Sequence, residues 1–306
     1  MNKYFDKKKA INDQQISYPL PKDKREIAKL WQISFNDSAE YIELFFDRVY
    51  KPENTLVIKR NGLIASTLQM VPYQAKIGDE IVPFAYICGA CTHPLERGKG
   101  LMKSLLDHAK RKMKRQGYHF SIVIPAEPSL FNFYRDLGFT SLISHVIEKR
   151  SFNVCLSNEA EKKSDYSFEA CTSNHFPYFD RNQNECQQTI LHDDYDFETI
   201  LQELNCCDDK AIVALKDNTT VGMAFAEKNS ADTNTPLIKK IFADNEEVQN
   251  ALCRHIAKVF DNQEVIVHFP LQHHSPTTDT NAYGLACNLN GKNRVLNLFN
   301  MSLMHD

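Results

Sequence analysis

Hydrophobic residues recur every three or four positions over residues 22–35, which predicts a helix. A second helix is expected directly afterwards, because Asp37 or Ser38 can cap a run with the same spacing. After these helices the spacing of apolar residues changes to one typical of strands. Two apolar runs on either side of the turn sequence Asn61-Gly62 predict a β-hairpin. These runs cover residues 55–58 and 63–71.

The next part of the chain has the pattern of strand, loop, helix and strand. An apolar segment that begins at Phe84 ends near Thr92, and helical spacing resumes over residues 100–116. Residues 120–124 then form a short apolar run that Pro125 terminates. This order places a glycine-containing loop between the end of a strand and the start of a helix.

A polar stretch without periodicity, residues 157–165, reads as a linker. Residues 1–156 and 166–306 are then expected to be two domains. The length of 306 residues agrees with this division, since single domains commonly have about 100–200 residues.

The second domain looks like a degenerate copy of the first. The predicted hairpin aligns without gaps with residues 214–221 when Lys59 is set opposite Lys216. A strand over residues 237–241 then leads into a helix over residues 246–260, as a strand leads into a helix in the first domain. Several elements in the same order favour an internal repeat.

Composition argues against several classes of function. The formal net charge of -3 argues against a nucleic-acid binder that relies on bulk charge. The start of the chain lacks the apolar run of a signal peptide, and no segment has the roughly 18 apolar residues of a membrane helix. We therefore expect a soluble, cytoplasmic protein without a membrane partner.

Cysteine and histidine residues give no strong sign of a metal site. The nine cysteines are an odd number, which favours free thiols, and the adjacent Cys206 and Cys207 lack the spacing of zinc ligands. His268, His273 and His274 also match no metal-binding motif and are expected in a loop.

Candidate chemistry is concentrated in the loop that contains Arg97, Gly98, Lys99 and Gly100. A loop between a strand and a helix can direct backbone N–H groups toward a phosphate. The two glycines let a ligand approach the backbone closely, and the two basic residues add positive charge. The loop therefore predicts a phosphate-bearing cofactor.

The segment Arg97-Gly98-Lys99-Gly100-Leu101-Met102 resembles the Arg/Gln-x-x-Gly-x-Gly/Ala motif of the GNAT superfamily of acyl-CoA-dependent N-acyltransferases, although Met102 replaces the final Gly or Ala. A second family signature follows as Phe131-Asn-Phe-Tyr134-Arg-Asp-Leu-Gly138-Phe139. The resemblance covers about residues 22–150. Within the superfamily, the chain is similar to the tandem-domain, enhanced-intracellular-survival type. It implies an α/β (α+β) fold, with a mixed GNAT sheet and helices on both faces, followed by a degenerate GNAT-like domain.

The resemblance also implies roles for individual residues. Acetyl-CoA is the expected cosubstrate, and the chemistry needs no metal. The expected cofactor contacts are Ala90, Cys91, Thr92, Arg97, Gly98, Lys99, Gly100, Leu101, Met102 and Ser129. A backbone N–H at residues 90–92 would polarise the acyl carbonyl, and Tyr134 would protonate the leaving thiolate. The strand before the loop carries no Glu, so the C-terminal carboxylate of Asp306 is the candidate base, as in the tandem-domain type.

Two acidic clusters bear on ligand binding, one on the amine substrate and one on the cofactor. Asp37, Glu40, Glu43 and Asp47 could form an acidic lip for a cationic amine, although a solvated helix face is the commoner origin of such a pattern. In the second domain, the counterpart of the glycine loop contains three carboxylates that would repel a phosphate, so one cofactor site per chain is expected. These carboxylates belong to Asp244, Glu246 and Glu247.

The sequence thus predicts an acetyl-CoA-dependent N-acetyltransferase that acts on the primary amine of a small molecule. Two alternatives are an enzyme that acetylates a protein or peptide amine and a sensor that binds acyl-CoA without turnover. No nucleic-acid partner is expected, and formation of a homo-oligomer is left open.

Overall fold

The computed structural model describes residues 16–152, 165–228, 235–270 and 280–291. The helices of the first half are α1 (Lys24–Ser34), α2 (Ala39–Arg48), α3 (Leu101–Arg115) and α4 (Leu130–Asp136). Its strands are β1 (Ile16–Ser17), β2 (Thr55–Arg60), β3 (Leu63–Ile77), β4 (Glu80–Thr92), β5 (Phe120–Val123) and β6 (Ser141–Ser151). The helices and strands predicted for this half are confirmed, in the predicted order.

The β2–β3 hairpin turns at the predicted residues. Asn61 and Gly62 have φ angles of 51° and 80°, the positive values that a two-residue turn between antiparallel strands requires. β3 is longer than predicted and continues to Ile77. Residues 64–71 are buried on both faces, and buried and exposed side chains alternate only from Pro72 to Ala75, where the strand remains paired with β4.

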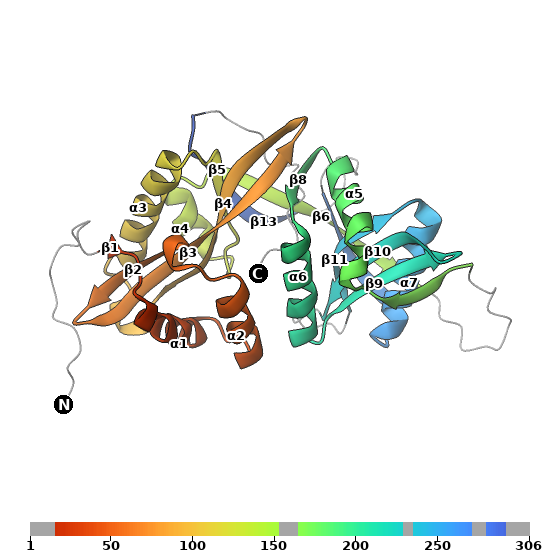
Figure 1. The fold of residues 1–306 in the computed structure, drawn as a ribbon, viewed down its shortest axis with the longest axis horizontal. Coiled ribbons are helices and arrows are strands. Elements are labelled where there is room, and N and C mark those ends of the chain that lie inside the picture. The colour runs from red at the N-terminus through yellow and green to blue at the C-terminus, as the bar shows by residue number, and fades with distance from the viewer. Residues whose placement is uncertain (1–15, 153–164, 229–234, 271–279, 292–306) are drawn as a thin grey trace.

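Helices cover both faces of the first-half sheet (Figure 1). On one face, α1 and α2 bury side chains such as Trp31 and Phe45 in a core with residues of β3 and β4. On the opposite face, α3 buries Leu105 and Met113, and Tyr134 of α4 joins the same core. The helical spacing of apolar residues accounts for both packings, since it places them on a single side of each helix.

The second half repeats this order of elements. Its helices are α5 (Phe176–Glu185), α6 (Asp194–Cys206) and α7 (Glu246–Val259). Its strands are β7 (Ser167–Ala170), β8 (Gln188–Leu191), β9 (Lys210–Lys216), β10 (Thr219–Glu227), β11 (Leu237–Ala243), β12 (Glu264–Pro270) and β13 (Thr280–Asn288). Two helices, a hairpin, a strand, a helix and a strand occur in the same order as in the first half, and β8 is an addition between the two helices.

The alignment of the two hairpins requires a shift of one residue. The second hairpin turns at Asp217 and Asn218, which have φ angles of 49° and 62°. Lys216 therefore corresponds to Arg60, and the predicted match with Lys59 is wrong by one position. Pairing the two asparagines misplaces the turn, because Asn tolerates a positive φ at either central position.

The two halves exchange strands at the centre of one mixed sheet. The sheet order is β1-β2-β3-β4-β5-β13-β6-β12-β11-β10-β9-β7, and β8 pairs with β3 outside this path. β13 lies between β5 and β6, with Leu285 opposite both Val123 and Leu142. β6 also pairs with β12. The sheet that carries the glycine loop is therefore completed by a strand from the second half, which the sequence does not predict.

Other contacts join the halves beside this exchange. Arg48, at the end of α2, donates from Nε to Oγ1 of Thr199 at 2.8 Å and from Nη2 to Oε2 of Glu198 at 3.0 Å, both on α6. Its guanidinium lies 4.2 Å from the ring centre of Tyr195. The predicted linker falls almost entirely outside the described residues, so the division into domains 1–156 and 166–306 stays a prediction.

The remaining predictions concern thiols, histidines and membranes. The cysteines in the described ranges are free, as predicted. His268 lies in β12 and not in a loop, so that prediction is wrong for this residue, and His273 and His274 lie outside the described residues. Across the part of the chain that is described, no group of side chains could hold a metal ion. None of the helices described has the length and apolarity needed to cross a bilayer.

Candidate active site

The parallel pairing of β4 with β5 ends before β4 reaches the glycine loop. Their parallel pairing begins with Phe84 opposite Phe120 and ends with Ile87 opposite Val123. β4 nevertheless continues to Thr92 and stays paired with β3. Beyond residue 87, β4 has no strand partner on its β5 side within the described residues. The segment 90–92, predicted to polarise an acyl carbonyl, lies in this stretch.

The glycine loop presents its backbone directly to a ligand. Gly98 and Gly100 have φ angles of 74° and 75°, which residues with a side chain rarely adopt. A Cβ added at either position would meet no described atom within 4 Å. Gly100 is the N-cap of α3, and the first turn of this helix carries neither a side-chain cap nor an acidic residue. Such a helix start offers N–H groups and a partial positive charge to an anion.

Side chains within the loop hold it in shape. Lys99 Nζ is 2.6 Å from Oε1 of the buried Glu96 and donates to the carbonyl oxygen of Leu95 at 3.0 Å. Arg97 Nε donates to the carbonyl oxygen of Thr92 at 3.2 Å. Because the Lys99 ammonium is engaged inside the loop, its expected contact with a cofactor would come from its backbone N–H.

The corresponding helix of the second half starts differently. The side chain of Asn245 caps α7 by accepting a hydrogen bond from the backbone N–H of Val248 at 3.0 Å. Glu246 and Glu247 occupy the first turn. Asp244 accepts a hydrogen bond from the Tyr178 hydroxyl at 3.0 Å. The N-terminus of α7 is therefore already capped and surrounded by carboxylates, which disfavour an anionic ligand.

Tyr134 lies on α4 and is 6% exposed. Its ring packs edge-on against Phe133 and Phe139, with centroid distances of 5.2 Å and 5.9 Å. Burial raises the pKa of the phenol to about 12, and the nearby thiol of Cys91 contributes to the rise. The phenol is therefore protonated at neutral pH and lies within electrostatic reach of the strand segment 90–92.

Other predicted contact residues are distributed around this region. Leu101 is buried, and Met102 packs partly buried against the same core as Tyr134. Ser129 is exposed at the N-cap of α4, and its Oγ donates to Oε2 of Glu127 at 3.2 Å. Asp306 lies outside the described residues.

A β-bulge interrupts β4 just beyond its last pair with β5. The register shifts between Thr67 and Gln69 of β3, where two residues of β4, Gly89 and Ala90, lie opposite one. Gly89 has a φ of 54°. A Cβ added there would be 2.1 Å from Oε1 of Gln69 and 2.4 Å from a ring carbon of Trp31. The side chains of Gln69 and Trp31 thus occupy the space that a side chain at this glycine would need.

The polar side chains of β3 that flank the bulge are buried and lack partners among the described residues. Gln69 is 1% exposed and Thr67 is 0% exposed. Within the described part of the chain, neither amide atom of Gln69 nor Oγ1 of Thr67 has a hydrogen-bond partner. A buried polar group left unpaired costs about 1–3 kcal/mol. The sequence reasoning did not single out these residues, although a glycine inside an apolar strand is a recognisable sign of a bulge.

Trp31 connects the bulge to the loop between α1 and α2. Its indole Nε1 donates to Oδ2 of Asp37 at 2.6 Å. Burial raises the pKa of the Asp37 carboxyl above its ordinary value, against the effect of the indole hydrogen bond. Glu40, Glu43 and Asp47 are exposed, as the solvated-face interpretation predicts. Asp37 is thus the one member of this acidic series that faces partly inward.

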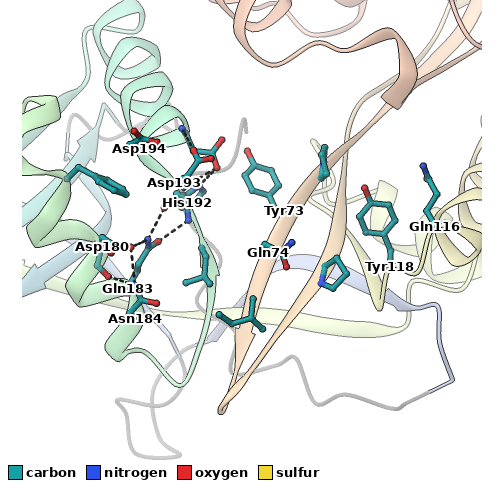
Figure 2. Close-up of a pocket in the computed structure, with 16 residues that line it drawn as sticks. Tyr73, Gln74, Gln116, Tyr118, Asp180, Gln183, Asn184, His192, Asp193 and Asp194 are labelled. Carbon is teal, nitrogen blue, oxygen red and sulfur yellow. Dashed lines mark hydrogen bonds and ion pairs between the residues drawn. The ribbon is translucent and has the colours of Figure 1, made fainter.

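A separate cavity of about 650 Å³ lies between the halves. Tyr73 of β3 faces His192 and Asp193 across it (Figure 2). The part of β4 that lines this cavity extends no further than Pro83, six residues before Gly89, which is about 20 Å along a strand. This cavity is therefore distinct from the region where β4 and β5 separate.

Comparison with known proteins identifies the first half. Residues 16–142 match the family model described as the acetyltransferase (GNAT) domain. This segment is a GNAT acetyltransferase domain. The match supports acyltransferase activity for this domain, and its mixed sheet is the one that the sequence predicts. No curated protein sequence matches the chain.

Solved structures share the fold across both halves. A GCN5-related N-acetyltransferase from Anabaena variabilis matches with a TM-score of 0.68 and 16% identity, covering 90% of this chain and 72% of that one. Eis1 from Mycobacterium abscessus matches with a TM-score of 0.64 and 9% identity, covering 90% and 74%. Saccharomyces cerevisiae N-myristoyltransferase with bound myristoyl-CoA matches with a TM-score of 0.56 and 10% identity, covering 98% and 91%. At these identities the likeness shows the fold alone, and it includes the second half.

Proposed function

We propose that this protein transfers an acetyl group from acetyl-CoA to the primary amine of a small molecule. The observation that carries the proposal is the uncapped start of α3, where Gly98 and Gly100 have positive φ and leave the backbone open. The N–H groups of this helix start suit the pyrophosphate of CoA. The capped and acidic start of α7 supports a single cofactor site per chain.

The residues around the strand separation suit the chemistry of the transfer. The acceptor nitrogen attacks the thioester carbonyl carbon, the carbon–sulfur bond breaks, and the CoA thiolate takes a proton. A backbone N–H in the segment 90–92 would stabilise the negative charge on the carbonyl oxygen. Tyr134 is the proposed proton donor, since its pKa of about 12 keeps the phenol protonated at neutral pH.

The acceptor must also lose a proton, because alkyl amines are mostly ammonium ions at neutral pH. We propose the terminal carboxylate of Asp306 as the base. β13 ends at Asn288, opposite Phe120, about 17 Å along the strand direction from Gly89. Residues 292–306 would span about 50 Å if extended, so the chain is long enough to return. Asp37 is the second candidate, because its half-buried carboxyl has a raised pKa and is linked to the bulge through Trp31.

Turnover of acetyl-CoA with a panel of amines tests the proposed reaction. The panel contains polyamines, aminoglycosides, amino acids and peptides, and release of free CoA is measured together with the acetylated product. The proposal predicts an N-acetylated product with at least one small amine and a lower kcat/KM with peptides. Tight acetyl-CoA binding without turnover of any amine would contradict it and would favour an acyl-CoA sensor.

Two variants separate the candidate bases. A short extension after Asp306 removes the carboxylate from its position, and Asp37→Asn removes the second candidate. If Asp306 is the base, the extended protein loses turnover and keeps its affinity for acetyl-CoA, while Asp37→Asn stays active. Full activity in the extended protein combined with an inactive Asp37→Asn would assign the role to Asp37. The exposed Glu40→Gln serves as the control for a lost negative charge on the same face.

A further inference from the structure

The buried amide of Gln69 is an unfavourable choice for the interior of a protein. Both of its polar atoms lack partners among the described residues, and Oγ1 of Thr67 on the same face of β3 is in the same situation. An apolar side chain of equal size would fill the space without leaving polar atoms unpaired. The packing among the described residues therefore gives no reason for a glutamine at this position.

The position of the amide indicates what a glutamine can do here. Oε1 of Gln69 lies beside Gly89, closer than a Cβ on that residue would allow. Both amide atoms are buried beneath the surface, so a substrate cannot reach them directly. The groups within their reach belong to the protein itself, and the bulge is among them, since a Cβ on Gly89 would be 2.1 Å from Oε1 of Gln69. This bulge lies just beyond the point where β4 loses its pairing with β5.

Gly89 gives the bulge freedom to change its hydrogen bonding. Its φ of 54° is accessible to glycine at little cost, and bulges commonly re-aim groups beside active sites. Trp31 presses on the same residue from α1 and limits the directions in which the backbone can move. A peptide group that rotates here needs a polar partner on the β3 side, and the unpaired amide of Gln69 is placed to be that partner.

We propose that Gln69 is a positioning residue for acyl transfer, whose side-chain amide hydrogen-bonds the peptide groups of the Gly89–Ala90 bulge when acyl-CoA is bound. The amide would thereby fix the backbone N–H that faces the thioester oxygen. This inference rests on the proposed function, because it assigns Gln69 to the same site. It acts through the backbone and makes no contact with the substrate.

The substitution Gln69→Met tests the role, since methionine has a similar size and no hydrogen-bonding amide. The matched control is Gln74→Met, which alters an exposed glutamine of the same strand. We expect Gln69→Met to keep or raise the midpoint of thermal unfolding, because it removes unpaired buried groups. We expect kcat to fall about 10- to 100-fold, with the Kd for acetyl-CoA within about twofold, as misplaced catalytic groups do elsewhere.

A spectroscopic measurement distinguishes positioning from a structural role. The ¹³C signal of acetyl-CoA labelled at its carbonyl reports polarisation of the bound thioester. We expect a downfield shift on binding to the unaltered protein and a smaller shift on binding to Gln69→Met. Unchanged kcat and an unchanged carbonyl shift in Gln69→Met would overturn the inference while leaving the proposed function intact. A Gln69→Met protein that unfolds would overturn it as well, because the amide would then be needed for the fold. Failure of the unaltered protein to bind acetyl-CoA would end both proposals.

Discussion

Replacement of Gly89 by alanine probes the bulge most directly. The added Cβ would lie 2.1 Å from Oε1 of Gln69 and 2.4 Å from the Trp31 ring, well inside contact distance. The φ of 54° adds a conformational penalty of about 1–2 kcal/mol for any residue with a side chain. Overpacking of a tightly filled interior costs about 1–3 kcal/mol more. We therefore expect Gly89→Ala to lower the free energy of unfolding by about 2–5 kcal/mol.

Gly62→Ala is the matched control for this prediction. Gly62 has a φ of 80°, and a Cβ there would meet no described atom within 4 Å. It should lose only the conformational part, about 1–2 kcal/mol. Urea unfolding can be followed through the fluorescence of Trp31, the single tryptophan of the chain. Equal losses in the two variants would refute the claim that Gln69 and Trp31 press on the bulge, since steric overlap would then contribute nothing.

Other predictions address the acid and a buried cation. Tyr134→Phe should keep acetyl-CoA affinity and lower kcat about 10²- to 10⁴-fold; unchanged turnover would show that Tyr134 is a packing residue only. The buried cation is Lys240, which is 3% exposed. Its Nζ lies 5.1 Å from the ring centre of Phe242 and 5.8 Å from that of Phe179. Burial lowers the pKa of this ammonium from 10.5 to about 8. The folded state therefore disfavours the ammonium, a cost that is complete below pH 8 and is relieved as pH rises from 8 to 10.5. This lowering of the pKa corresponds to about 3 kcal/mol, so Lys240→Met should be more stable by up to that amount at pH 7 and by little above pH 10.5. Urea unfolding of both proteins at several pH values checks this, and a gain independent of pH would contradict it.

The loop and its flanking elements were predictable because their signals are local. Glycine at positions 98 and 100 marks positive φ, and the spacing of Leu105 and Met113 marks the buried face of α3. The turn at Asn61-Gly62 was predictable for the same reason. Where the local signal was ambiguous, as with the two asparagines of the aligned hairpins, the prediction erred by one residue.

The parts that the sequence did not predict depend on partners far away in the chain. An apolar run such as Leu285-Ala286-Cys287 indicates a buried strand, but its pattern does not say that the neighbours are β5 and β6. The pairing of β8 with β3 is equally non-local. The contact of Gln69 with Gly89 arises from strand register, which a single bulge changes. The engagement of Lys99 with Glu96 depends on the fold of the loop itself.

The stoichiometry and site of acetyl-CoA binding test the central claim, that the open start of α3 holds the only cofactor of the chain. Isothermal titration calorimetry of the unaltered protein should give one site per chain. Gly100→Glu should weaken binding about 10- to 100-fold, because it places a carboxylate where the phosphate would lie. Gly78→Glu, at a glycine with a φ of 61° and open space around it at the far end of the β3–β4 hairpin, should leave affinity unchanged. Two sites per chain, or equal affinity in Gly100→Glu and the unaltered protein, would contradict the account.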